Sequence, residues 1–470
     1  MTVPKPSQVP LLGHRPLRRT VAWYEGQAVT AAQFLAEAQA LSDRLPPAGQ
    51  LINLCQNRYH FALGMVAALL RGQLSLMPPN AMPQTLQQVR RPGVDALALV
   101  DHPDADTADL QRFTVTRTPL VAEPTLDETR TVPFDLEAVC LLTSGSTGTP
   151  QPHPKRWGPL QININAEADR LAELLNLPDL DGLNLVATVP PEHSYGIESS
   201  VLLALLGGAA FDSGRPFYPA DIAQALERLP RPRGLITTPF HLKNLLLSGV
   251  PLPPVDMVLS ATAPLTPQLA AQAEQATGGR LLEIYGCTEA GQVAARRTLD
   301  GEVWCTLGEM RLHARPGADG EEYVVSGGHV AEPTALSDVL ELIDSRHFRL
   351  LGRANDLIHV AGKRSSLAHL NFHLNRIPGV QDGAFWLPDD SPGDVTRPVA
   401  FVVAPELTAA QIIDALRQQL EPLFVPRRVL HVAALPREAT GKLTVGALRA
   451  FALSALAGAP AAPPLGKAGA

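Results

Sequence analysis

Hydroxyl-bearing side chains and glycines are concentrated at residues 143–148, which read Thr-Ser-Gly-Ser-Thr-Gly after an apolar segment at 136–142. The glycines permit positive φ angles and close approach of the backbone to a ligand. The hydroxyls stand beside backbone N–H groups that can surround an anion. The apolar segment predicts a buried strand that delivers a polyphosphate-binding loop, although such a run can also be an ordinary solvent turn. The candidate phosphate-binding residues are Thr143, Ser144, Gly145, Ser146, Thr147 and Gly148.

Two common nucleotide-binding patterns are absent from the sequence. A P-loop requires Gly, four residues and then Gly-Lys-Ser/Thr, whereas Gly441-Lys442 is followed by Leu443 and has Pro436 at the first glycine position. No Gly-x-Gly-x-x-Gly run opens a helix after a strand, so a dinucleotide fingerprint is missing too. The phosphate loop is therefore of another type.

The elements that position this loop are predicted by alternating helical and strand-like segments. Thr30 is a plausible N-cap for a helix with apolar residues at helical spacing, and a second helix is expected at 59–70. The strand-like runs are residues 51–54, 96–100, 183–189, 234–238 and 257–260. This alternation predicts a large layered α/β domain.

The pattern changes after residue 301 to short strands and turns, at 322–326 and 348–351, which predicts a small β subdomain. A compact C-terminal α/β domain follows, with strands at 383–387, 399–403 and 428–432 and a helix at 408–420 capped by Thr408. We expect an N-terminal domain at 1–354 (β subdomain about 301–352), a hinge at 355–357, a small mobile lid domain at 358–454 and a disordered tail at 455–470.

Composition narrows the class of protein. The chain has 470 residues with 39 basic and 46 acidic side chains, a net charge of −7, and no basic stripe, so no nucleic-acid partner is expected. Four widely spaced cysteines suit a reducing cytosol. The N-terminus lacks the apolar core of a signal peptide, and the longest apolar run, 201–211, is too short to span a bilayer, so we expect no membrane association.

Several segments resemble, in order, the motifs of the adenylate-forming family, which includes acyl-CoA synthetases, peptide-synthetase adenylation domains and luciferases. The phosphate loop resembles that family's Thr-Ser-Gly-Ser/Thr-Thr-Gly-x-Pro-Lys, with Gln151 in place of the lysine and Lys155 as a candidate cation for the outer phosphates. Pro190-Pro-Glu-His-Ser-Tyr-Gly196 resembles a His-x-Tyr-Gly segment that places His193 beside the carboxylate pocket. A lone histidine in a loop is more often structural.

The tightest match is Tyr285-Gly-Cys-Thr-Glu289, which is similar to the family's Tyr-Gly-x-Thr-Glu. The resemblance implies an aromatic face for adenine from Tyr285 with Gly286, a hydroxyl for the α-phosphate from Thr288, and a Mg²⁺ ligand from Glu289. Asp338 is the candidate for binding the ribose hydroxyls. The stretch that would pack against adenine is Ser260, Ala261, Thr262 and Ala263.

The C-terminal motifs follow the same family order. Gly352-Arg-Ala-Asn-Asp-Leu-Ile358 resembles the family's domain junction, which implies that Arg353 reaches the ribose and Asn355 acts as a hinge. Gly362 and Arg364 match a turn that lines the entry of the thiol. Lys442 follows Gly441 as in the family's terminal Pro-x-x-x-x-Gly-Lys, and its ammonium would bridge the carboxylate and the α-phosphate.

The resemblance implies an AMP-forming acid–thiol ligase that uses ATP and Mg²⁺. A carboxylate would attack the α-phosphorus, and the thiol of an acyl carrier protein or of coenzyme A would displace AMP. The expected acid pocket, near residues 193–199, 259–263 and 285–292, is small and apolar with Glu198 as its charge, which suits a hydroxybenzoate-like acid. The alternatives are a medium- or long-chain fatty acid ligase, an adenylate-binding protein impaired by Gln151 and Asn355, a luciferase-type enzyme or a scaffold.

Overall fold

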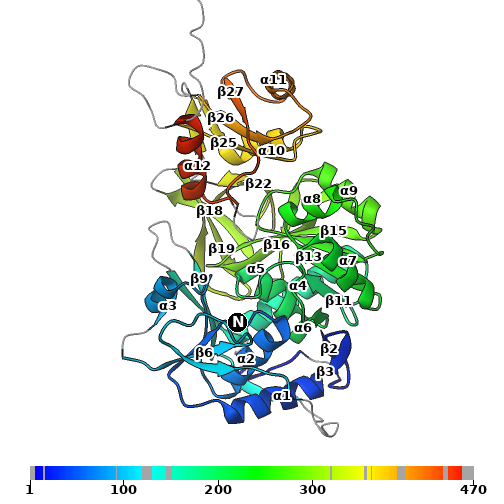
Figure 1. Ribbon diagram of the computed structural model, residues 1–470, viewed down its shortest axis with the longest axis vertical. Helices are drawn as coiled ribbons and strands as arrows, with labels where there is room; N and C mark the ends of the chain where they lie inside the picture. The colour runs from blue at the N-terminus through cyan, green and yellow to red at the C-terminus, as the bar shows by residue number, and fades with distance from the viewer. Residues whose placement is uncertain are drawn as a thin grey trace, which may run out of the picture. The chain divides into compact units, whose positions relative to one another are not determined.

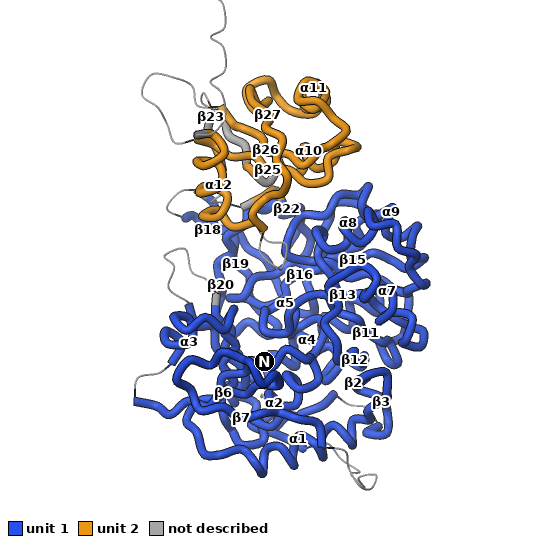
Figure 2. Tube along the Cα trace, in the orientation of Figure 1, with its two compact units in different colours: residues 1–350 blue, residues 351–470 orange. Residues whose placement is uncertain are grey.

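The computed structural model divides into two compact units, residues 1–350 and 351–470 (Figure 2). The division falls after Leu350, near the junction expected at 354. The structure describes residues 6–13, 16–90, 93–118, 130–143, 151–317, 320–353, 357–360, 363–388, 397–437 and 443–457.

An eleven-stranded sheet forms the centre of the first unit, in the order β21-β22-β17-β16-β15-β14-β13-β11-β12-β2-β3. The strands are β2 (Thr20–Tyr24), β3 (Gln27–Thr30), β11 (Asn184–Ala187), β12 (Ala210–Asp212), β13 (Arg233–Thr237), β14 (Met257–Ser260), β15 (Arg280–Cys287), β16 (Gly291–Arg297), β17 (Val303–Thr306), β21 (Asp338–Leu342) and β22 (His347–Arg353). The run from β2 through β15 is parallel, and β16 turns back antiparallel to β15. The carboxyl ends of β11, β13, β14 and β15 therefore meet at one edge of the sheet.

Helices cover both faces of this sheet (Figure 1). Leu235, Val258 and Leu281 pack with the helices α7 (Pro219–Arg228), α8 (Pro239–Leu247) and α9 (Pro267–Thr277). The next residue of each strand joins the opposite core, which contains α4 (Trp157–Leu175). Both faces are buried because successive side chains of a strand point to opposite sides, which explains why these strands are almost continuously apolar.

A second, six-stranded sheet carries the phosphate-loop strand, in the order β10-β9-β5-β4-β6-β7. Its strands are β4 (Gln50–Asn53), β5 (Ser75–Met77), β6 (Ala96–Val100), β7 (Gln111–Thr114), β9 (Glu137–Thr143) and β10 (Gln151–Arg156). β9 is the buried strand predicted before the loop. It pairs antiparallel with β10, so residues 144–150 connect two neighbouring strands.

The remaining elements of the first unit frame these sheets. Thr30 caps the predicted helix α1 with a capping box that includes Gln33, as its position in the sequence predicts. These elements are α1 (Ala31–Arg44), α2 (Arg58–Leu70), α3 (Pro83–Val89), α5 (Ser194–Gly196), the π-helix η1 (Ile197–Leu202), α6 (Leu203–Leu205), the 3₁₀ turn η2 (Thr298–Asp300), and a pair of short strands, β1 (Gln8–Pro10) and β8 (Thr131–Pro133).

The region expected to be a β subdomain divides between two sheets. A separate three-stranded sheet consists of β18 (Arg311–Gly317), β19 (Gly320–Gly327) and β20 (Val330–Leu336). The neighbouring β17, β21 and β22 instead extend the large sheet. Turn residues in the sequence locate these strands but do not show which sheet each one joins.

The second unit has its own apolar core around Phe385, Val402 and Ile412. Its elements are β23 (Leu357–Val360), β24 (Lys363–Ser366), α10 (Leu367–Asn375), β25 (Asp382–Trp386), β26 (Val399–Val403), α11 (Ala409–Arg417), β27 (Arg428–His431) and α12 (Val445–Ala457). Thr408 caps α11 as predicted. α12 extends to Ala457, so residues 455–457 belong to a helix and not to the tail expected from 455 onward.

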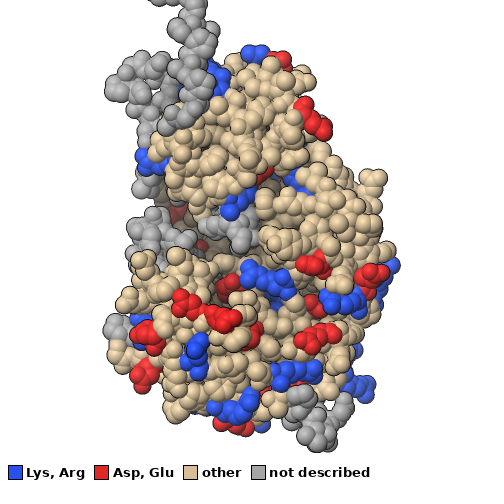
Figure 3. Space-filling view, viewed as in Figure 1, with Lys and Arg blue, Asp and Glu red and all other residues tan. Residues whose placement is uncertain are grey.

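None of the helices that the structure describes is long and apolar enough to cross a membrane. On the face shown in Figure 3, acidic and basic side chains of the first unit are interspersed. All four cysteines are free, and Cys55 and Cys140 are buried.

Candidate active site

The segment after β11 is held in place by a glycine. A Cβ on Gly196 would lie 1.7 Å from the carbonyl oxygen of Pro190, so only glycine permits this turn. Tyr195 also holds the segment against β14, because its hydroxyl donates to the carbonyl oxygen of Leu259 at 2.8 Å. His193, at the N-terminus of α5, is half-buried. The His193 segment therefore adjoins the end of β14.

The small residues after β14 lie in this same region. Ser260 is fully buried, and its hydroxyl has no hydrogen-bond partner among the residues that the structure describes. Thr262 has a φ of 79°, which is uncommon for a β-branched residue and costs conformational energy. Ala261 is buried, whereas Thr262 and Ala263 are exposed. Such strain concentrates at functional sites.

Tyr285 and Asp338 are brought together at the end of β15. The Tyr285 hydroxyl donates to Oδ2 of Asp338 at 2.8 Å. The Tyr285 ring packs against Trp304 and Phe348, with centroids 5.9 and 5.5 Å apart. A Cβ on Gly286 would lie 2.4 Å from the Gly291 carbonyl oxygen, at the register shift between β15 and β16. Tyr285 and Asp338, the two candidates for nucleotide binding, are far apart in the sequence, and the fold joins them by a hydrogen bond.

Thr288 and Glu289 lie in the turn after β15, and Glu289 contacts the phosphate-loop strand β10. Lys155 Nζ donates to the Glu289 carbonyl oxygen at 3.0 Å, and His153 Nε2 lies 3.9 Å from Oε1 of the same residue. His153 and Lys155 share a face of β10 because they are two residues apart. This contact brings the candidate outer-phosphate cation beside the candidate metal ligand.

The donor set at Glu289 fits Mg²⁺. Its carboxylate is about half exposed, and Mg²⁺ usually takes one or two carboxylates together with waters and substrate phosphates. Among the described residues no group of three His, Cys, Asp or Glu side chains could enclose a metal by itself. Glu289 with the phosphates of a nucleotide is the arrangement that suits this ion.

Sequence reasoning missed His329, which braces the same turn from the hairpin between β19 and β20. Its Nε2 lies 2.6 Å from the carbonyl oxygen of Ala290. Burial lowers the pKa of His329 to about 4, so the ring is neutral and donates this hydrogen bond. Burial also raises the pKa of Cys287 to about 12, so its thiol is not a nucleophile at neutral pH.

A second group that sequence reasoning missed lies behind the His193 segment. We name it the acceptor cluster: Asn163, Glu167, Glu198, Ser199 and Gln292. Glu167 Oε1 accepts from Ser199 Oγ at 2.8 Å, and Gln292 Nε2 donates to the same hydroxyl at 2.7 Å. Asn163 Nδ2 donates to the Gln292 carbonyl oxygen at 3.0 Å. Only Glu198 was singled out from the sequence, as an odd charge.

Burial sets the protonation of both carboxyls. Burial raises the pKa of Glu167 to about 8 and the pKa of Glu198 to about 7. The charge of Glu198 also contributes to the raised pKa of Glu167. Lys155 and the Ser194 hydroxyl, which donates to Glu198 Oε1 at 2.9 Å, oppose the shift of Glu198. Glu167 is therefore mostly protonated at neutral pH. A helical reading of α4 could have found it, because Asn163 and Glu167 fall on its apolar stripe.

The other predicted residues are only partly described. Ser144, Gly145, Ser146, Thr147, Gly148, Asn355, Gly362 and Lys442 lie outside the described residues. Thr143, Arg353 and Arg364 lie on β9, β22 and β24, where only the backbone is described.

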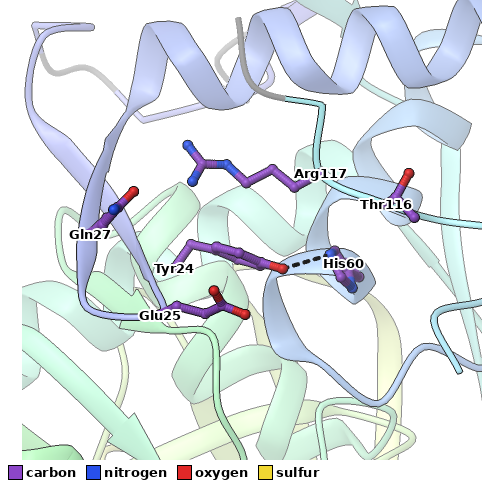
Figure 4. Close-up of a pocket in the computed structure, with 6 residues that line it drawn as sticks. All are labelled: Tyr24, Glu25, Gln27, His60, Thr116 and Arg117. Atoms are coloured by element: carbon purple, nitrogen blue, oxygen red, sulfur yellow. Dashed lines mark hydrogen bonds between the residues drawn. The ribbon is translucent and has the colours of Figure 1, made fainter.

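A surface pocket of about 340 Å³ lies elsewhere in the first unit (Figure 4). We name it the Arg117 pocket; it is lined by Tyr24, Glu25, Gln27, His60, Thr116 and Arg117. The Arg117 guanidinium lies 5.1 Å from the Tyr24 ring centroid, and its Nε is 3.1 Å from Oε1 of the buried Glu37. His60 pairs with Asp101 at 3.3 Å. Arg117 is thus paired with Glu37, and His60 with Asp101.

Comparisons with known proteins show which family this chain resembles. Residues 13–310 match the family model described as "AMP-binding enzyme", and residues 373–442 match "AMP-binding enzyme C-terminal domain". A 4-coumarate–CoA ligase of Halorhodospira halophila is 30% identical over 311 residues, which cover 64% of this chain and 73% of that protein. A 3,4-dihydroxybenzoate–[aryl-carrier protein] ligase of Bacillus anthracis is 23% identical, covering 64% and 71%.

A solved structure shares the fold of both units. The crystal structure of the anthranilate CoA ligase AuaEII in complex with anthranoyl-AMP has a TM-score of 0.77 and 16% identity, covering 94% of this chain and 96% of that one. The large N-terminal and small C-terminal α/β domains predicted from the sequence are thereby confirmed. The family model covers more than half of the chain. This chain belongs to the AMP-binding enzyme family.

Proposed function

We propose that this chain is an AMP-forming acid–thiol ligase that activates an aromatic carboxylic acid. The observation that carries the proposal is the convergence of four separate segments in the first unit: the Tyr285–Asp338 pair, the Glu289 turn, strand β10 with Lys155, and the His193 segment against β14. Nucleotide, metal and acid candidates thus share the carboxyl edge of one parallel sheet, where α/β proteins bind ligands.

Each group has a chemical task in this proposal. Tyr285 and Asp338 position the nucleoside, and His193 shapes the seat of the acid. Glu289 would hold Mg²⁺, which when bound neutralises phosphate charge. Lys155 adds positive charge beside Glu289 and compensates for Gln151, which replaces the family's lysine. Repulsion between the carboxylate and the phosphates makes this positive charge necessary.

The second unit would supply the remaining groups. Lys442 aligns the carboxylate with the α-phosphorus during adenylation, and Arg353 contacts the ribose. Rotation about Asn355 then brings Gly362 and Arg364 to the entry of the thiol. The acceptor is the phosphopantetheine thiol of an acyl carrier protein or that of coenzyme A, and the enzyme would work in the cytosol.

Two features support an aromatic acid. The relatives named above act on coumarate, dihydroxybenzoate and anthranilate, as their names state. In this chain, Glu198 is buried beside the His193 segment. A fatty acyl chain against a buried carboxyl would leave its polar atoms without partners, which costs free energy. An aromatic acid with polar substituents avoids that cost.

An acid-dependent ATP–pyrophosphate exchange screen tests the proposal. Wild-type protein should exchange with aromatic acids and not with acetate or amino acids. Lys442→Ala should slow exchange by about two to three orders of magnitude, because a donor aimed at the transition-state charge contributes roughly 3 to 4 kcal/mol. Exchange by the variant near the wild-type rate would remove Lys442 from the mechanism. No exchange with any acid would favour the impaired adenylate-binding protein.

The acceptor is tested separately. Preformed acyl-adenylate should be consumed by a phosphopantetheinylated carrier protein and by coenzyme A at different rates, and mass spectrometry of the thioester identifies the preferred acceptor. Release of free acid alone would exclude the thiol step.

A further inference from the structure

The acceptor cluster has more hydrogen-bond acceptors than donors. Glu167 Oε2, Gln292 Oε1 and Asn163 Oδ1 are buried without a hydrogen-bond partner among the described residues. Most buried polar atoms in folded proteins have partners. Because all three atoms accept hydrogen bonds, the missing partners must be donors. A proton on Glu167 supplies one donor, so the cluster still has more acceptor atoms than donors.

Glu198 connects this cluster to the acid seat. It is 1% exposed and is the second residue of the π-helical segment η1, a rare conformation that is frequent at functional sites. Oε1 accepts from the hydroxyl of Ser194, which follows His193 directly. On the other side, Lys155 lies near enough to stabilise the Glu198 carboxylate. Glu198 therefore lies between the metal side of the site and Glu167.

The carboxyls of the acceptor cluster differ in their partners from two other buried acids. Glu37 pairs with Arg117 and Glu283 with Arg296, at 3.1 and 2.6 Å. Neither Glu167 nor Glu198 has an ion pair among the described residues, whereas a permanently buried carboxyl is usually paired. A ligand that carried a full positive charge would meet a largely protonated group at Glu167, so an uncharged donor suits the cluster better.

We propose that the acid substrate carries an uncharged hydrogen-bond donor, a hydroxyl or aromatic amine, at the end away from its carboxylate, and that Glu198 accepts this hydrogen bond as a specificity-determining residue. The inference rests on the proposed function and names its substrate class. Hydrogen bonds to Glu167 and from Gln292 hold Ser199, the residue that follows Glu198. A hydroxyl or amine proton would add a hydrogen bond to this buried carboxyl, whereas a methyl group of the same size would not.

The experiment compares matched acids in pyrophosphate exchange by the full-length protein. The panel is the hydroxy-, amino- and methylbenzoates, substituted at each ring position. For the best hydroxy or amino acid, kcat/KM should exceed that of its methyl counterpart by ~100-fold or more, because sites built to bind a hydroxyl strongly reject analogues without one. Glu198→Leu should reduce this ratio at least tenfold and leave the KM for ATP unchanged.

A matched control separates this effect from general damage. Glu37→Gln changes a buried carboxyl outside the site and should leave the substrate ratio within about twofold of wild type. If Glu198→Leu does not fold, Glu198→Gln keeps the volume and the Ser194 contact but exchanges one acceptor for a donor, and should lower the ratio about tenfold.

The outcomes are distinct. Exchange with aromatic acids but equal rates for hydroxyl, amine and methyl analogues would overturn this inference and leave the proposed function intact. An undiminished ratio in the Glu198 variants would overturn it as well. Absence of exchange with every acid would instead refute the proposed function, and this inference with it.

Discussion

The Arg117 pocket and the acceptor cluster both contain buried carboxyls, but they satisfy them differently. Burial raises the pKa of Glu37 behind the Arg117 pocket, while the hydroxyl of Tyr59 and the guanidinium of Arg117 oppose that shift. The Tyr59 hydroxyl donates to Glu37 at 2.9 Å. In the acceptor cluster the partners of Glu167 and Glu198 are neutral hydroxyls. The carboxyl behind the Arg117 pocket has a cation and a hydroxyl donor as partners, whereas the acceptor cluster contains acceptor atoms without a donor among the described residues.

The difference indicates which buried charge serves stability and which serves a ligand. A buried carboxylate with a cation and a hydroxyl donor is a structural unit, and breaking it leaves a charge without compensation. A buried carboxyl without a cation is tolerated because it is protonated, and it keeps capacity for another donor. On this comparison the Arg117 pocket has the features of a structural site, and our proposal assigns the ligand to the acceptor cluster.

The largest effect on this comparison should come from Arg117→Met. Removing the guanidinium leaves Glu37 buried without a cation, which typically costs about 3–5 kcal/mol of unfolding free energy. Urea denaturation measures the loss, and pyrophosphate exchange per folded molecule should stay at the wild-type value. The double variant with Glu37→Gln should recover most of the stability. Unchanged stability in the single variant would show that the ion pair contributes little.

The pH dependence of stability should reveal the acceptor cluster. The folded pKa of Glu167, about 8, lies above its ordinary value of 4.5. Between these values the folded protein holds a proton that the unfolded chain has released. Stability from this group is complete below about pH 4.5 and is lost as the pH rises to about 8, by up to about 1.4 kcal/mol per pH unit.

Glu167→Gln is the control for that slope, because the amide does not titrate. The unfolding free energy should fall less steeply between pH 6 and pH 8 in Glu167→Gln than in the wild type. In Glu37→Gln, which keeps Glu167, the fall should be steeper than in Glu167→Gln. Equal slopes in wild type and Glu167→Gln would mean that Glu167 is ionised in the folded protein.

A smaller effect is expected for Glu167→Gln at pH 7 itself. Because the carboxyl is mostly protonated there, a neutral amide of similar shape should change the unfolding free energy by about 1 kcal/mol or less. Chemical denaturation at this pH measures it. A loss above about 3 kcal/mol would indicate a charged, paired carboxylate.

The smallest effect should come from Tyr24→Phe in the Arg117 pocket. The Tyr24 hydroxyl and His60 Nε2 are 3.4 Å apart, which is long for a hydrogen bond, and the site is partly exposed (Figure 4). The change in unfolding free energy should be within about 0.5 kcal/mol. Thermal melts of the two proteins should nearly coincide, and a large shift would assign this hydroxyl a structural role.

Local patterns predicted most of the elements in the fold. The alternation of strands and helices predicted the strands later seen as β4, β6, β13 and β14, and the caps Thr30 and Thr408 were placed correctly because capping depends on neighbouring residues. The sheet membership of β17, β21 and β22 was not predictable. Pairing between distant strands depends on tertiary packing, which the local pattern does not encode.

The candidate site shows the same division. Motif residues such as Tyr285 and Asp338 were identified, but their hydrogen bond joins strands β15 and β21, and nothing in either motif predicts it. Glu167 and His329 escaped notice because one lies within a helix and the other in a hairpin, with no motif around them. Their roles depend on burial, which the fold alone decides.

The amino-acid sequence determined which chemical groups are present, the order of the motifs and the two-unit α/β architecture, because these follow from residue type, spacing and hydrophobic periodicity. Only the tertiary structure decided that Glu198 and Glu167 are buried together with hydroxyl partners and without an ion pair among the described residues. Desolvation acts on a carboxyl only when distant segments enclose it, so its pKa and its capacity for a ligand are properties of the folded chain.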